Sequence, residues 1–228
     1  MFADPDLSSI AALIADPSRA AMLVALLGGQ ALPATELAQC AKISPQTAST
    51  HLNKLVTGHL VTVKRQGRHR YYCLASSEVA TVLETLTTLA PTPPVRSFGQ
   101  SQRAKAIRRA RTCYDHLAGQ LGVELTRQLV SRNLLEPIEP AYQVTTQGEQ
   151  WFDEFGIDLK LLRQQRRTFA CQCLDWSERH YHLAGALGAA LQSRCFDLAW
   201  IQRIPASRAM RITEVGRVEL FNVFGIRF

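Results

Sequence analysis

Polar side chains suited to contacting nucleic-acid bases gather in one short segment, SPQTASTHLNK at residues 44–54. These side chains carry amide, hydroxyl, imidazole and ammonium groups, and they are those of Gln46, Thr47, Ser49, Thr50, His51 and Lys54. Ala48, Leu52 and Leu55 fall between them at helical spacing, which predicts a helix with one buried face and one polar face. A helix fits the major groove of duplex DNA, where groups of these types read base edges. We therefore expect this helix to contact double-stranded DNA.

Positive charge surrounds the same segment. Residues 41–75 hold six lysines and arginines and no Asp or Glu, although the whole chain has a formal net charge of only +7. We expect phosphate contacts, which weaken as salt rises, from Lys64, Arg65, Arg68, His69 and Arg70. The alternative is a solvated polar surface on a winged-helix adaptor that binds protein and not DNA. The absence of acids favours DNA.

The elements that must position these groups follow from periodicity. Apolar spacing predicts a helix over residues 10–27, broken at Asp16-Pro17, and a second helix over 35–41. The polar helix begins at Ser44, whose hydroxyl can cap it, with Pro45 at its first position. Two β-branched or aromatic runs, 60–64 and 70–74, flank Gly67 and predict a hairpin, and a closing helix is expected at 77–89. Helices followed by a basic hairpin form a winged helix-turn-helix domain over residues 1–90.

The second half of the chain repeats itself. A proline-rich segment, 91–102, predicts a linker. Beyond it, CYDHLAGQLG at 113–122 recurs as CLD at 173–175 and, after six residues, HLAGALG at 182–188. VTTQGEQWFDEFGI at 144–157 recurs as ITEVGRVELFNVFGI at 212–226. We expect a C-terminal domain, 103–228, made of two degenerate winged-helix-like repeats at about 103–160 and 161–228. The expected fold class is mainly α with small β-hairpins (α+β).

Three sequence segments resemble those of a known family: ADPSRAAMLVAL at 15–26, ELA at 36–38 and SPQTASTHLNKL at 44–55. Over roughly residues 8–90 the chain resembles the ArsR-type (ArsR/SmtB-like) bacterial winged-helix repressors, and its whole pattern resembles a longer subgroup with a duplicated C-terminal domain. The resemblance implies a homodimer on an inverted-repeat operator, dimer contacts from the first and last helices of the domain, and control by an effector. The Cys-x-Cys metal site of the best-known members is absent, because Pro33 and Thr35 stand at its positions.

Ionisable and aromatic groups inside the repeats are candidates for an effector pocket. They are Tyr114, Asp115, His116, Asp175, Trp176, Arg179 and His182. Such groups can form the polar lining and walls of a small-molecule site. The structural alternative is that Asp115 and Asp175 bond to helix ends or to arginines such as Arg109, Arg111 and Arg179. No cofactor is required by either interpretation.

Cysteines offer a second kind of sensor. Cys113, Cys171 and Cys173 are candidates for soft-metal binding or thiol redox chemistry, and the repeat gives Cys113 the role of Cys173. If Cys171 and Cys173 lie on a helix, their sulfurs point ~200° apart and chelation requires local unwinding. The alternative is that the three thiols only pack in the core.

Other classes of protein are disfavoured. The chain has no nucleophile elbow, phosphate loop or HExxH motif, so we do not expect an enzyme. No run reaches the ~18 apolar residues of a membrane span. The N-terminus, MFADPDLSSI, lacks the basic start of a signal peptide, which predicts a cytoplasmic protein whose six cysteines are not paired in disulfides.

Overall fold

The protein is described by a computed structural model, which covers residues 4–91, 94 and 97–228. The chain divides into two compact units, residues 1–86 and residues 87–228. No single helix in the described residues is long and apolar enough to cross a membrane; the helices Leu7–Ala15 and Pro17–Leu26 would meet that criterion only if joined, and they are bent by 90°.

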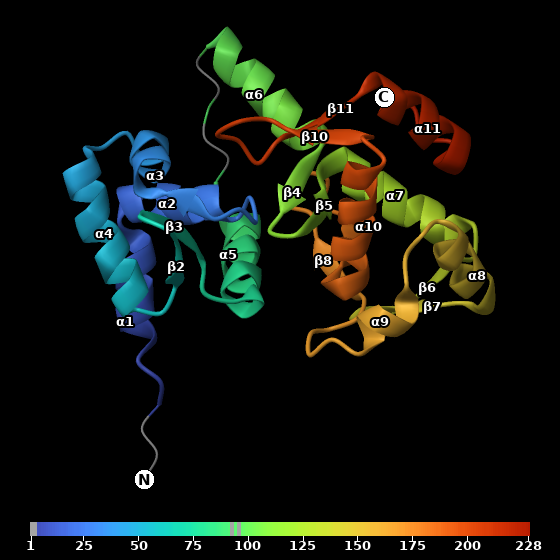
Figure 1. Ribbon diagram of the computed structural model, residues 1–228, viewed down its shortest axis with the longest axis horizontal. Helices are drawn as coiled ribbons and strands as arrows, with labels where there is room; N and C mark the ends of the chain where they lie inside the picture. Colours follow the sequence, from blue (N-terminus) through green and yellow to red (C-terminus); the bar gives the residue numbers. More distant parts are fainter. Residues whose placement is uncertain (1–3, 92–93, 95–96) are drawn as a thin grey trace. The chain divides into compact units, whose positions relative to one another are not determined.

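The first unit has the predicted helix and hairpin order (Figure 1). Its elements are α1 (Leu7–Ala15), α2 (Pro17–Leu26), β1 (Leu32–Pro33), α3 (Ala34–Ala41), α4 (Pro45–Thr57), β2 (Val61–Gln66) and β3 (His69–Leu74), followed by α5 (Ser77–Leu89). The strands form an antiparallel sheet in the order β1-β3-β2. The winged helix-turn-helix prediction is confirmed, and only the short strand β1 was not expected.

Local chemistry explains where these helices begin and end. The Asp16 carboxylate accepts the backbone N–H of Arg19 at 2.9 Å, so the break at Asp16-Pro17 ends α1 and starts α2. Ser44 caps α4 by accepting the Thr47 N–H at 3.1 Å. Between α3 and α4, Lys42 adopts a left-handed conformation with φ 55°, which turns the chain. Ala48, Leu52 and Leu55 then face the core, fully buried.

The second unit contains two runs of elements in the same order. After α6 (Phe98–Arg109), the first run is β4 (Arg111–Cys113), β5 (His116–Ala118), α7 (Gly119–Ser131), β6 (Leu135–Ile138), β7 (Ala141–Val144) and α8 (Thr146–Glu154). After α9 (Leu159–Arg163), the second is β8 (Cys171–Leu174), β9 (Tyr181–Ala184), α10 (Gly185–Asp197), β10 (Ile201–Arg203), β11 (Met210–Ile212) and α11 (Glu214–Phe224). One sheet, in the order β6-β7-β8-β9, includes strands of both runs.

Two local predictions differ from the structure. The segment with Cys171 and Cys173 is strand β8 and not a helix, because the Gln172 backbone N–H bonds to Pro140 and the strand pairs with β9. The predicted linker, 91–102, includes residues 92–93 and 95–96, which lie outside the described residues. Its last five residues, 98–102, belong to α6, which the Ser97 side chain caps through the Gln100 N–H.

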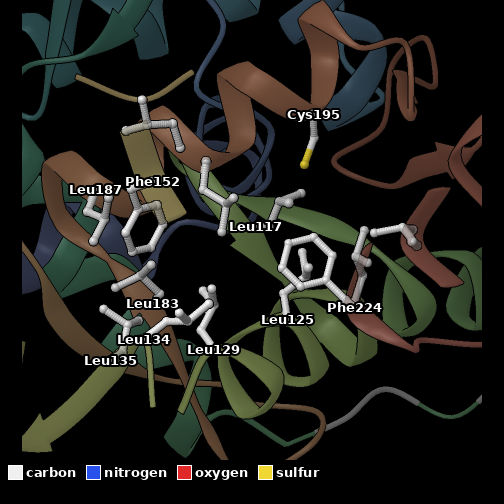
Figure 2. Close-up of a cluster of buried hydrophobic side chains, with 14 of the residues drawn as sticks. Leu117, Leu125, Leu129, Leu134, Leu135, Phe152, Leu183, Leu187, Cys195 and Phe224 are labelled. Carbon is white, nitrogen blue, oxygen red and sulfur yellow. The ribbon is translucent and has the colours of Figure 1, made fainter. Parts of the chain in front are cut away.

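A single hydrophobic core holds the two runs together. Figure 2 shows Leu117, Leu125 and Phe152 from the first run beside Leu183, Leu187 and Phe224 from the second. All six are at most 4% exposed. Full burial of each such side chain contributes about 1.5–3 kcal/mol, so the two runs are packed as one unit and not as separate modules.

Candidate nucleic-acid interface and cysteine-histidine cluster

The polar face of α4 is exposed as predicted. Gln46, Thr47, Ser49, Thr50 and Lys54 are all open to solvent. The Ser49 hydroxyl donates to the Pro45 carbonyl at 3.0 Å, and Thr50 makes the equivalent bond to Gln46. Each hydroxyl therefore donates within the helix, and its oxygen can still accept a hydrogen bond.

His51 differs from the other predicted contacts on α4. Its ring is half-buried, with Nδ1 lying 3.3 Å from Nη1 of Arg19 and 3.8 Å from Oδ1 of Asp16. Arg19 in turn donates to the backbone carbonyls of Leu13 and Ala12 at 2.7 and 2.8 Å. His51 therefore connects α4 to the junction of α1 and α2.

The hairpin β2–β3 carries the predicted basic residues on its exposed end. Arg65 lies directly opposite Arg70 in the antiparallel register, and Gln66 lies opposite His69. Lys64, Arg65, Arg68, His69 and Arg70 are all exposed. The turn is made possible by Gly67 at φ 59°. Like charges placed directly opposite destabilise a sheet, so this register costs folding free energy in the isolated protein.

The second unit brings four metal-binding side chains together. The ligand atoms of Cys113, His116, Cys173 and His182 all lie within 4.8 Å of one another. The sulfurs of Cys113 and Cys173 are 3.8 Å apart, and the Nε2 atoms of His116 and His182 are 3.2 Å apart. Cys113, His116 and His182 are buried, and Cys173 is half-buried. This cluster of two thiols and two imidazoles is called the Cys2His2 cluster below.

Two carboxylates lie behind the histidines. Oδ1 of Asp115 is 3.3 Å from Nδ1 of His116, and Oδ2 of Asp175 is 3.6 Å from Nδ1 of His182. Asp115 forms an ion pair with Arg167. Asp175 accepts from Nη2 of Arg111 at 2.8 Å and from the Gly119 N–H, at the start of α7, at 2.7 Å. The structural alternative is thus confirmed for Asp175, which pairs with Arg111, while Asp115 pairs with Arg167, an arginine not among those expected.

The hydrogen bonds and ion pairs in and around the cluster shift the pKa values of its groups. The Cys113 thiol, together with His116 and His182, holds the pKa of the Cys173 thiol far below its usual value, despite burial. Burial disfavours charge on His116, but its hydrogen bonds to Asp115 and Cys173 prevail and raise the pKa of His116 to about 9. Burial also opposes ionisation of Asp175, but Arg111 keeps the pKa of that carboxyl well below its usual range. These contacts therefore favour the thiolate form of Cys173.

Other predicted site residues lie outside this cluster. Cys171 is not part of it. It lies two residues before Cys173 on the same face of β8, one step further along the strand; burial raises the pKa of its thiol. Trp176 stacks under the guanidinium of Arg111, 4.4 Å from the ring centre. Tyr114 forms the turn between β4 and β5 with φ 59°. Arg179 is exposed and donates to the Thr88 carbonyl.

The sequence alone places the cysteines and the histidines in two different candidate sites, whereas the structure brings two of each together. Arg111, one of the arginines expected to bond to the aspartates, is 1% exposed. The sequence repeat did contain a signal that the cysteines and the histidines belong to one site. When CYD at 113–115 is aligned with CLD at 173–175 and HLAG at 116–119 with HLAG at 182–185, residues 176–181 being an insertion, both a cysteine and a histidine coincide in the two repeats.

Comparison with known proteins finds a family match within the first unit. Residues 14–64 match a family described as a helix-turn-helix domain. The solved structures that resemble the chain include the cadmium metal-sensor CMTR from Mycobacterium tuberculosis, 31% identical, with a TM-score of 0.32 over 40% of this chain and 99% of that one. They also include HlyU from Vibrio cholerae N16961, 27% identical, with a TM-score of 0.33 over 36% of this chain and 88% of that one.

One relative matches nearly the whole chain. It is a protein of Bacillus subtilis (strain 168) described as the uncharacterized HTH-type transcriptional regulator YdfF. It is 46% identical over 215 residues, which are 94% of this chain and 95% of the relative. The protein therefore belongs to the family of helix-turn-helix transcriptional regulators.

Proposed function

We propose that this regulator is an ArsR-type repressor that binds an operator as a homodimer, through α4 and the β2–β3 hairpin. The observation that carries the proposal is the position of Arg65 opposite Arg70, with Lys64 and Arg68 beside them and no acid anywhere in residues 41–75. Phosphates beside the hairpin would neutralise this charge. The repulsion between Arg65 and Arg70, which destabilises the free protein, is then relieved when DNA is bound, and this relief favours binding.

The polar face of α4 supplies the groups that read bases. Gln46 can bond to an adenine edge and Lys54 to a guanine edge, while Thr47, Ser49 and Thr50 can bond to either type of base. His51 acts by positioning, since it faces Asp16 and Arg19. Its part is to hold α4 against the α1–α2 junction.

Apolar surface on α1 and α5 supports the homodimer. Within the described residues α1 contributes no buried side chain, and its Leu7 is 76% exposed. On α5, Val82, Leu86 and Leu89 are 53%, 43% and 78% exposed, and their spacing places them on one face of the helix. A second copy of the chain would cover this surface. A two-fold dimer would place the two α4 helices in half-sites about one helical turn, ~34 Å, apart.

The second unit is the proposed effector domain. We assign residues 103–228 to it as a duplicated module with repeats at about 103–160 and 161–228, because the two runs of elements have the same order. Of the two effector classes, a metal ion is favoured over an organic ligand. Asp115, His116, Asp175 and His182, expected in a pocket, bond to one another and to arginines. The metal alternative is thus kept for Cys113 and Cys173 and withdrawn for Cys171.

DNA binding is tested by selecting bound sequences from a random duplex library and measuring affinity for the recovered site by fluorescence anisotropy at several salt concentrations. Replacing both Arg68 and Arg70 with Ala should weaken binding to all sequences and reduce the slope of log affinity against log salt by about 2. The control replaces exposed Arg217 and Arg227 with Ala, which removes the same charge from the second unit. An unchanged slope in the hairpin variant, or an equal loss in the control, would contradict the assignment.

A further inference from the structure

We propose that Cys113, His116, Cys173 and His182 form a tetrahedral site for one zinc ion, which clamps the β4–β5 hairpin to the β8–β9 hairpin. This site lies wholly within the second unit, and it rests on the metal proposed there for Cys113 and Cys173. It stands or falls independently of the proposed operator binding.

The spacing of the donor atoms fits zinc. Tetrahedral coordination with Zn–S of ~2.3 Å and Zn–N of ~2.0–2.1 Å places two sulfurs ~3.8 Å apart and two nitrogens ~3.3 Å apart. The structure has 3.8 Å between the Cys113 and Cys173 sulfurs and 3.2 Å between the histidine Nε2 atoms. Two edges of the tetrahedron, formed by different chemical groups, are thus already at the required length.

The strand register explains how the site is built. Cys113 lies directly opposite His116 across β4 and β5, and Cys173 lies directly opposite His182 across β8 and β9. Side chains directly opposite in an antiparallel pair share one face. Each hairpin therefore presents one thiol and one imidazole, and the two pairs meet face to face.

Helix packing fixes the two rings from the other side. A Cβ added to Gly122 of α7 would lie 3.7 Å from the Cβ of His182, and one added to Gly188 of α10 would lie 3.2 Å from the Cβ of His116. Each helix thus passes close to the histidine of the opposite hairpin, at a glycine. The close approach limits how far the imidazoles can move, which holds their Nε2 atoms in place.

The surroundings of the histidines are those of metal ligands. A histidine that binds a metal through Nε2 usually donates its Nδ1–H to a carboxylate. Asp115 is positioned to accept from His116, and Asp175 from His182. In the described part of the chain, Nδ1 of the fully buried His182 has no hydrogen bond, so the 3.6 Å separation from Asp175 needs only a small movement to close.

Charge balance favours a divalent cation over simple packing. Two thiolates and one Zn²⁺ sum to zero, and the nearby ion pairs Asp115–Arg167 and Asp175–Arg111 are already neutral. Four protein ligands close the coordination sphere, as in structural zinc sites. A mixed set of thiolate and imidazole ligands matches zinc better than it matches magnesium or calcium, which prefer oxygen.

The test measures zinc in the full-length protein, purified under reducing conditions, by plasma mass spectrometry. We expect one zinc per chain in the unaltered protein and in Cys171→Ser, the matched control on the same strand. Cys113→Ser and Cys173→Ser should lose the ion. Asp115→Asn, which alters a positioning residue and no ligand, should lower zinc affinity about 10–100-fold in a competition assay with a chromophoric chelator.

A second measurement needs no substitution and is independent of any folding defect in the variants. Cobalt(II) added to the metal-free chain should give the intense visible bands of tetrahedral coordination and a thiolate-to-cobalt charge-transfer band. Zinc should then protect Cys113 and Cys173, but not Cys171, from alkylation. The proposal would be overturned if the folded protein took up neither metal, if Cys171→Ser lost zinc as fully as Cys173→Ser, or if Cys113 and Cys173 formed a disulfide in place of the site under reducing conditions.

Discussion

Arg111 and Asp175 form an ion pair buried inside the second unit, with Nη2 of the guanidinium 2.8 Å from Oδ2 of the carboxylate. Their side chains are 1% and 0% exposed. The pair connects β4 to the turn that follows β8, and the Gly119 N–H and the Trp176 ring complete its surroundings. Because the partners belong to different runs of elements, the pair contributes directly to docking the two runs.

Removing the charge of Asp175 should strongly destabilise the protein. In Asp175→Asn the Arg111 cation remains buried without its counter-ion, and such changes cost about 3–5 kcal/mol. The free energy of unfolding, measured by urea titration followed by circular dichroism, should fall by that amount. The control is Glu149→Gln, which breaks the exposed pair with Arg163 and should cost less than about 1 kcal/mol. Equal effects of the two substitutions would contradict the importance assigned to burial.

Two glycines should resist substitution by alanine because the backbone of a neighbouring segment leaves no space. A Cβ at Gly148 would lie 2.1 Å from the Leu134 carbonyl oxygen, and one at Gly216 would lie 2.0 Å from that of Trp200. We expect Gly148→Ala and Gly216→Ala each to lower stability by about 1–3 kcal/mol in thermal unfolding. Gly99→Ala on α6, where nothing lies within 4 Å of the added Cβ, should change stability by less than about 1 kcal/mol.

The proposed dimer can be separated from the fold of the first unit. Val82→Glu combined with Leu86→Glu places charges on the exposed face of α5 and should convert a dimer to a monomer in light scattering coupled to size-exclusion chromatography. The helical circular dichroism signal should persist, because both positions are exposed within the chain. Val218→Glu on α11, also exposed, should leave the mass unchanged. A wild-type chain that elutes as a monomer at micromolar concentration would refute the dimer.

The cap of α2 should contribute a pH-dependent part of stability. The hydrogen bond from the Arg19 N–H, with the charges of Arg19 and His51, holds the pKa of Asp16 below its usual value. A carboxyl with a lowered folded-state pKa stabilises the protein above its unfolded pKa, near 4, and this contribution is lost as pH falls through the folded pKa. The difference in urea midpoint between the unaltered protein and Asp16→Ala should therefore shrink between about pH 6 and pH 3.

Ser44→Ala provides the comparison, because it removes a cap that does not titrate. Its cost, about 1 kcal/mol, should not follow the same pH dependence. If the Asp16→Ala difference stayed constant over the same range, ionisation of Asp16 would not be the source of its contribution.

Local signals were sufficient to predict the first unit. The N-caps Asp16 and Ser44, the prolines after them and the alternation around Gly67 act within a few residues, so their effects can be recognised without knowing the tertiary structure. The exposed polar face of α4 was predicted for the same reason, since exposed polar groups on a helix follow from its apolar spacing. His51 was an exception because its partners, Asp16 and Arg19, lie more than thirty residues away.

The Cys2His2 cluster could not be assembled from local signals. Cys113 and His116 form a recognisable pair only if the segment is a hairpin. The second pair, Cys173 and His182, is separated by eight residues, and only the register of β8 and β9 places its members opposite each other. The outer partners Arg111 and Arg167 depend on tertiary packing that no spacing rule describes. The repeated sequence indicated that Cys113 is equivalent to Cys173 and His116 to His182. It did not indicate that these equivalent residues lie close together in the folded chain.

The division of the proposed zinc site between two hairpins would make occupancy of the site a readout of assembly. One hairpin alone offers two donors, and an ion held by two donors exchanges readily with water. Tight retention begins only once residues about sixty positions apart in the chain have found each other. A newly made chain would thus capture its ion late in folding, after the second half has docked on the first, and a truncated chain would leave the ion to the solvent.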